Sequence, residues 1–148
     1  MQTAPEHLGR LVRRLQHRHH RALDAGLAPL GLSLVQWSAL REIDRHPGES
    51  QRRLAEHTVN SVQAFGALVQ RLISAGLVVR AAGPGRKTVH TLTAEGKRLL
   101  GKGTTVMTRV MYLSFAPLSA EDRAELERLL TLVLDGRNPQ PRDGRLRS

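Results

Sequence analysis

The first long segment of the chain, residues 5–27, has apolar residues three and four positions apart, which predicts one amphipathic helix. Its apolar face is formed by Leu8, Leu11, Val12, Leu15, His19, Ala22 and Leu23. The opposite face is basic, with Arg10, Arg13, Arg14, Arg18 and Arg21. Gly26 and Pro29 predict the end of this helix, because both residues disfavour its continuation.

Serines in capping positions predict where three shorter helices begin, at Ser33, Ser50 and Ser61. Gln36 supports the prediction for the first of these helices, because it completes a capping box with Ser33. We expect the first of these helices to end at Pro47 and Gly48, the second to end before residues 58–60, and the third to end at Gly76.

The last of these three helices has two distinct faces. Its apolar face is formed by Phe65, Leu68, Val69, Leu72 and Ile73. At about 100° per residue, the opposite face is small and polar, with Gln63, Ala67, Gln70 and Ser74 flanked by Ala64 and Arg71. Directly after it, a strand at residues 77–80, a turn at 83–85 and a returning strand at 88–92 predict a β-hairpin.

Two further helices complete the pattern. Thr93 caps a fifth helix, and Ser119 with Asp122 caps a sixth. The stretch after Gly136 is polar and rich in Pro and Arg, so residues 137–148 are expected to be disordered. The fold class is therefore mainly α with one small β-hairpin.

Composition narrows the function classes. The 148 residues are 40% hydrophobic and 24% charged, as expected for one globular domain. The absence of cysteine excludes disulfides, thiolate metal sites and cysteine nucleophiles. The sequence shows no apolar run of membrane-span length and no signal peptide, so we expect a cytoplasmic protein with no membrane partner.

The chain is strongly basic, with a formal net charge of +10. Such a charge attracts polyanions, of which nucleic acid is the commonest, while a membrane surface facing the basic first helix is the competing interpretation. Aromatic residues make up only 3% of the chain, which disfavours single-strand binding by base stacking. Double-stranded DNA is the predicted partner.

Two helices joined by a tight turn and followed by a hairpin form a winged helix-turn-helix, and here the chain resembles the MarR family of bacterial regulators. The matching residues are Gln36, Trp37, Leu54, Ala55, Glu56, Ser61, Leu68, Val69, Arg71, Leu72, Gly76, Leu77, Val78, Arg80, Leu92, Thr93, Glu95 and Gly96. The resemblance implies one domain over residues 1–136, with the winged helix-turn-helix at 33–96 and a helical dimerisation region at 5–30 and 97–136. It implies a homodimeric DNA-binding repressor that reads a pseudo-palindromic operator and is released by a small ligand.

The predicted DNA contacts combine the recognition helix, the helix before it and the wing. They are Arg52, Arg53, Ser61, Gln63, Ala64, Ala67, Gln70, Arg71, Arg80, Arg86 and Lys87. The recognition helix carries no Lys or Arg before Arg71, and Pro84 stands where the family has an acidic wing residue. With Gly66 inside the helix, either the backbone approaches the DNA closely there, or affinity is weak and comes mainly from the flanking cations.

For the inducer, the resemblance implies a crevice between the dimerisation helices and the winged domain, with an aromatic or lipophilic molecule as ligand. Its expected lining is His19, His20, Trp37, Leu40 and Met107.

No phosphate loop or catalytic triad is present, so neither an enzyme nor a cofactor is predicted. The spacing of His17, His20 and Asp24 suggests a metal site. Zinc needs three or four ligands, and no second close cluster of ligating residues completes such a site, so no metal site is assigned. The alternative function is a ligand or metal sensor whose DNA binding is weak or lost.

Overall fold

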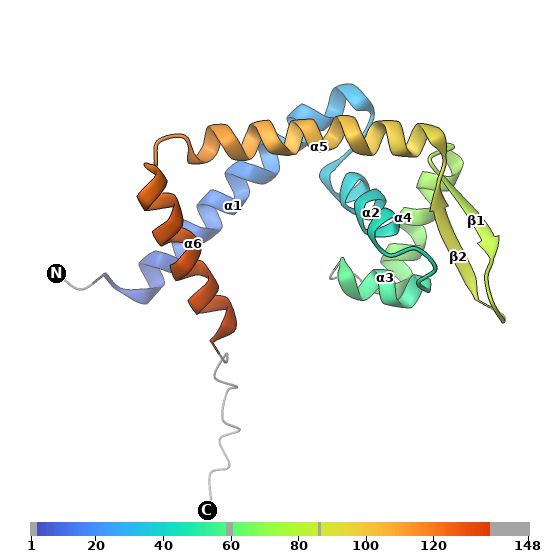
Figure 1. The fold of residues 1–148 in the computed structure, drawn as a ribbon, viewed down its shortest axis with the longest axis horizontal. Helices are drawn as coiled ribbons and strands as arrows, with labels where there is room; N and C mark the ends of the chain where they lie inside the picture. Colours follow the sequence, from blue (N-terminus) through green and yellow to red (C-terminus); the bar gives the residue numbers. More distant parts are fainter. Residues whose placement is uncertain (1–2, 59–60, 86, 137–148) are drawn as a thin grey trace, which may run out of the picture. The chain divides into compact units, whose positions relative to one another are not determined.

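The computed structural model describes residues 3–58, 61–85 and 87–136, and it confirms a mainly helical chain with one hairpin (Figure 1). Its elements are α1 (Pro5–Leu27), a 3-10 turn η1 (Ala28–Leu30), α2 (Leu34–Arg45), α3 (Gln51–His57), α4 (Val62–Ser74), β1 (Val78–Ala82), β2 (Thr88–Leu92), α5 (Ala94–Phe115) and α6 (Ala120–Asp135). The chain divides into two compact units, residues 1–111 and 112–148. The predicted disordered tail, residues 137–148, lies outside the described residues.

The predicted caps of the short helices are present. Ser33 Oγ accepts a hydrogen bond from the backbone N–H of Gln36 at 3.2 Å, and Gln36 Oε1 accepts one from the N–H of Ser33 at 2.9 Å. The hydroxyls of Ser50 and Ser61 likewise accept a backbone hydrogen bond at the starts of α3 and α4, without the reciprocal bond of a capping box. A cap satisfies N–H groups that the first helical turn leaves unpaired, so these serines define where the helices begin.

The first helix continues through Gly26, which we expected to help end it. α1 extends to Leu27 and passes into η1. A Cβ atom at Gly26 would lie 2.5 Å from Cγ1 of Val106 in α5. The glycine therefore serves close packing between α1 and α5 instead of helix termination.

The core of the first unit is built from α2, α3, α4 and the hairpin. Phe65 and Val69 of α4 are fully buried, as are Leu40 of α2 and Ala55 of α3. Trp37 is also buried, and its indole Nε1 donates to the backbone carbonyl of Leu100 in α5 at 3.3 Å. The apolar face predicted for α4 is thus the face that holds the helix in the core.

The hairpin is tied to its flanking helices by backbone and hydroxyl contacts. β1 and β2 are antiparallel, with Arg80 opposite His90. Thr93 donates its hydroxyl to the carbonyl of Gly76 at 2.7 Å and its N–H to the carbonyl of Leu77 at 3.0 Å. These bonds fix the wing to the C-terminal end of α4 and to the start of α5.

Several large apolar side chains of the chain face solvent. On α1 they are Leu8, Leu11, Val12 and Leu15, which form the predicted apolar face. In the second unit they are Tyr112, Leu113, Leu129, Leu130, Leu132, Val133 and Leu134, and α6 has no buried residue. A helix that exposes this much apolar surface usually has a protein partner. Nowhere in the described chain is a helix both long and apolar enough to cross a membrane.

Candidate nucleic-acid interface

The outer face of α4 is defined by four exposed residues, Gln63, Ala64, Ala67 and Gln70. The opposite side of the same helix is locked into the core, so this face has little freedom to rotate. Ser61 caps the helix, its Oγ accepting from the N–H of Ala64 at 3.1 Å. The amide and the methyl groups on this face are of the kinds that read adenine and thymine edges in a major groove.

Gly66 is half-buried and turns toward α3, not toward the outer face. A Cβ atom at this position would lie 2.7 Å from Nε2 of Gln51, the first residue of α3. The nearest atom is the end of a flexible side chain, so this position faces α3 without a rigid contact.

Cationic side chains flank the outer face of α4. Arg71, Arg80 and Lys87 are exposed, and Nη2 of Arg80 on β1 donates to Oε1 of Gln70 on α4 at 3.4 Å. This bond joins the wing to the recognition helix and places a guanidinium beside the outer face. Arg86, predicted at the wing tip, lies outside the described residues.

Two more predicted phosphate contacts, Arg52 and Arg53, lie on the first turn of α3 and are exposed. Arg53 Nη1 lies 3.8 Å from Oε2 of Glu56. Because both side chains are largely in solvent, this ion pair is weak and can yield to a phosphate.

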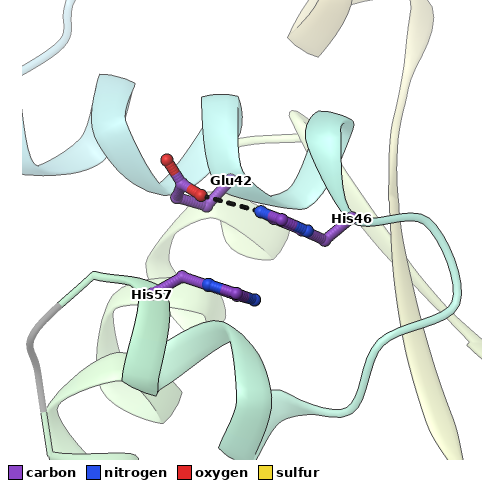
Figure 2. A group of neighbouring side chains, drawn as sticks. All are labelled: Glu42, His46 and His57. Carbon is purple, nitrogen blue, oxygen red and sulfur yellow. Dashed lines mark ion pairs between the residues drawn. The ribbon is translucent and has the colours of Figure 1, made fainter.

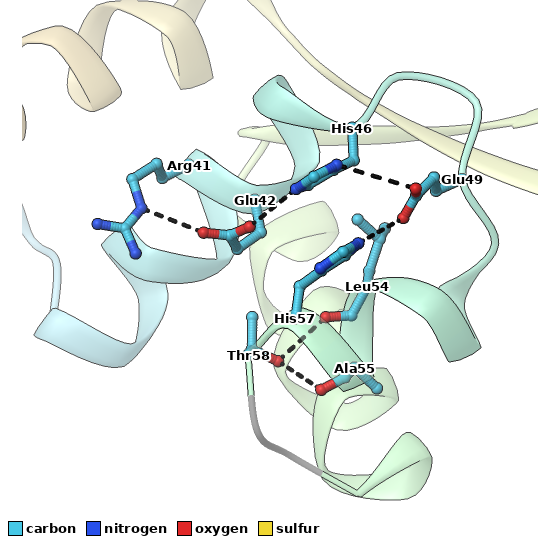
Figure 3. A network of polar contacts seen from close by, with 8 residues as sticks. All are labelled: Arg41, Glu42, His46, Glu49, Leu54, Ala55, His57 and Thr58. Atoms are coloured by element: carbon cyan, nitrogen blue, oxygen red, sulfur yellow. Dashed lines mark hydrogen bonds and ion pairs between the residues drawn. The ribbon is translucent and has the colours of Figure 1, made fainter. Parts of the chain in front are cut away.

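A polar network that was not predicted from the sequence joins the C-terminal ends of α2 and α3 (Figure 3). Glu42 accepts from Arg41 Nε at 3.2 Å and lies 3.2 Å from His46 Nε2. Glu49 lies 2.9 Å from Nε2 of His57. The four-residue spacing of Glu42 and His46 was the available signal, since it places both on one helix face.

The predicted ligand-lining residues are distributed between core and surface. Trp37 and Leu40 are buried in the core, and Met107 is half-buried against it. His19 is half-buried, and burial, followed by the charge of Arg18, lowers the pKa of its imidazole.

His20 is the member of the predicted set that lines a surface hollow of about 300 Å³. The hollow's other walls are Leu34, Val35, Ser38, Arg41, Glu42, His57 and Thr58. His20 also lies 3.0 Å from Asp24, the pair considered above for metal binding.

Comparison with known proteins decides the family. A MarR family model matches residues 30–87, from the end of η1 to the residue before β2. HTH-type transcriptional repressors of Mycobacterium tuberculosis and Mycobacterium bovis are each 34% identical over 125 residues, covering 83% of this chain and 90% of theirs. The chain belongs to the MarR family.

Solved structures of MarR proteins share the fold. A Mycobacterium tuberculosis MarR family protein in complex with p-aminosalicylic acid has a TM-score of 0.71 and 33% identity, over 88% of this chain and 98% of that one. The same protein in complex with DNA has a TM-score of 0.72 and 31% identity, with the same coverage. A mutant MarR from E. coli complexed with operator DNA has a TM-score of 0.78 and 25% identity, over 86% and 93% of the two chains. These matches confirm the winged helix-turn-helix predicted from the sequence.

Proposed function

We propose that this MarR protein is a sequence-specific, double-stranded DNA-binding transcriptional repressor that a small ligand releases from its operator. The observation that carries the proposal is the outer face of α4, held outward by a buried apolar face and bordered by exposed cations. A rigid helix with short polar and methyl side chains fits a major groove, and flanking cations bind phosphates without sequence preference. The protein acts by binding, not by catalysis, and DNA as partner puts it in the cytoplasm.

The active form is a homodimer. The exposed apolar side chains of α1, and separately those of the second unit, supply the surface that a second copy would cover. Two recognition helices related by two-fold symmetry contact half-sites about 10 base pairs apart. The operator is accordingly a pseudo-palindrome.

An aromatic acid is the best-supported class of ligand. Related structures contain salicylic acid and p-aminosalicylic acid. Here Arg41 lies with its guanidinium carbon 4.9 Å from the centre of the Trp37 ring and also lines the hollow that contains His20. A cation beside an aromatic ring and an apolar wall suits a carboxylate on a planar ring. We therefore expect salicylate to quench the fluorescence of the sole tryptophan and to weaken DNA binding.

One observation favours the alternative, a sensor with weak DNA binding. The first cation of α4 is Arg71, near the end of the helix, so the groove-facing half lacks a positive side chain. Affinity for DNA must then come mainly from the flanking cations. A measurement of DNA binding therefore distinguishes a repressor from a sensor that binds DNA weakly.

The test is selection of bound genomic fragments followed by mobility shifts with two variants. Gln63→Ala is expected to cost about 1–3 kcal/mol and to relax one base pair in each half-site. Arg80→Ala is expected to weaken binding to all sequences and to flatten the slope of log affinity against log salt by about one unit per subunit. Selected sites without an inverted repeat, or a motif unchanged by Gln63→Ala, would contradict the proposal.

A further inference from the structure

A second cluster of functional groups lies where the C-terminal ends of α2 and α3 meet. Figure 2 shows its members: Glu42 from the last turn of α2, His46 at the cap of that helix, and His57, the last residue of α3. Each residue offers one metal-ligating atom, and these atoms lie within 4.8 Å of one another. In the described part of the chain, this is the one such group of three or more.

The spacing of these atoms is close to that of a metal site. In a tetrahedral site with bonds of about 2.0–2.1 Å, neighbouring ligand atoms lie about 3.3 Å apart. Glu42 Oε2 and His46 Nε2 are already 3.2 Å apart. The His57 ring stacks on the His46 ring at a centroid distance of 3.9 Å and an angle of 5°, and the ligand atoms of all three side chains lie within 4.8 Å of one another.

Two of these three side chains, Glu42 and His57, are held by a hydrogen bond with a neighbour, and His46 lies near a carboxylate (Figure 3). Arg41 Nε donates to Glu42 Oε1 at 3.2 Å, which leaves Oε2 facing the cluster. Glu49 lies 2.9 Å from His57 Nε2 and 3.8 Å from His46 Nδ1, which leaves the other nitrogen of each ring for an ion. Metal-ligating histidines typically have a carboxylate on the second nitrogen, because it orients the ring and raises its basicity.

We propose that Glu42, His46 and His57 bind one divalent transition-metal ion of the Zn²⁺ type, with Arg41 and Glu49 as the residues that orient the ligands. Two imidazoles and one carboxylate favour such an ion over Mg²⁺ or Ca²⁺, which prefer oxygen ligands. Three protein ligands leave a fourth position for water. Glu42 and His57 also line the hollow of about 300 Å³, which gives the ion a route from solvent.

A bound ion would cross-link α2 to α3. The last residue of α3 is His57, and α4 begins at Val62, so the link lies just before the helix that we propose to contact DNA. Because metal binding requires the folded arrangement of both helices, it stabilises the folded state. The proposal itself requires no DNA, so it can fail or succeed independently of the proposed function.

The test is titration of the metal-free full-length protein with ZnCl₂ by calorimetry, together with Co²⁺ absorption spectra. Wild-type protein is expected to bind one ion per chain. His46→Gln and His57→Gln are each expected to abolish this stoichiometric binding, and Glu49→Gln to weaken it by about 10–100-fold. The control is His17→Gln, which removes an exposed histidine of α1 that does not line this hollow, and it should bind as wild type does.

Thermal unfolding shows whether each variant is folded. Without metal, His57→Gln is expected to melt close to wild type, because the removed side chain is partly exposed. Zinc at about 100 times its dissociation constant should raise the wild-type Tm by roughly 5–10 °C and leave that of His57→Gln unchanged. No saturable binding by wild type, binding retained by His57→Gln, or binding lost in His17→Gln would each overturn the proposal.

Discussion

The strand β2 contains a histidine in an unusual environment, and substituting it tests how the wing is stabilised. His90 is 2% exposed, and among the described residues neither of its ring nitrogens has a hydrogen-bond partner. Burial, followed by the charge of Arg80 on the opposite strand, lowers the pKa of His90. Above about pH 6.5 this imidazole is therefore neutral in the folded protein, and no group in the described part of the chain pairs with its donor or its acceptor.

Two separate effects follow from this environment. An unpaired buried polar group costs about 1–3 kcal/mol, so His90→Leu, which fills a similar volume without polar atoms, should raise the free energy of unfolding at pH 8 by about 1 kcal/mol or more. Protonation also favours the unfolded chain, because an unfolded histidine takes up a proton near pH 6.5 and the folded one only at lower pH. The folded protein thus loses stability as the pH falls below about 6.5, by at most about 1.4 kcal/mol per pH unit.

The assay is urea unfolding followed by the fluorescence of Trp37, at pH 8, 6.5 and 5 and at one fixed protein concentration. His90→Gln separates the two effects, because it keeps a buried polar group but cannot take up a proton. Both variants should lose less stability than wild type between pH 6.5 and 5, and only His90→Leu should be more stable than wild type at pH 8. Equal acid sensitivity in wild type and His90→Gln, or a destabilised His90→Leu at pH 8, would refute the reasoning.

Two further substitutions test packing and capping. A Cβ atom at Gly96 would collide with the backbone carbonyl oxygen of Leu77, so Gly96→Ala should lower the free energy of unfolding by about 1–3 kcal/mol in urea titrations. Gly101, on the same helix with nothing within 4 Å of its Cβ position, is the matched control, and Gly101→Ala should instead stabilise by about 0.5–1 kcal/mol. Ser61→Ala removes the hydrogen bond to the N–H of Ala64 and should cost about 1 kcal/mol in thermal unfolding, whereas Ser61→Asp keeps the cap and should restore most of it. Equal effects of the two glycine substitutions, or of the two serine substitutions, would contradict these assignments.

The sequence by itself determined the helices, their caps and the faces of α4. These features depend on residues within one or two turns of each other. Ser33 and Gln36 complete their capping box without any distant partner. The stripe that includes Phe65 and Val69 is buried because helical periodicity places these residues on one side. The outer face with Gln63 follows from the same geometry, so both fold class and candidate interface could be predicted.

The tertiary structure alone decided which distant residues meet. Gly26 was predicted to end a helix, yet the structure packs it against Val106, and a Cβ atom at Gly66 would point toward Gln51 of the preceding helix. A glycine's role depends on what lies opposite its missing Cβ, and local sequence does not contain that information.

The cluster of Glu42, His46 and His57 was missed for the same reason. Glu42 and His46 share a helix face, but His57 belongs to the next helix, and only the packing of α3 on α2 brings its ring onto that of His46. Side chains that meet across two helices are specified by packing angle and register, which arise from the whole core and not from any local pattern.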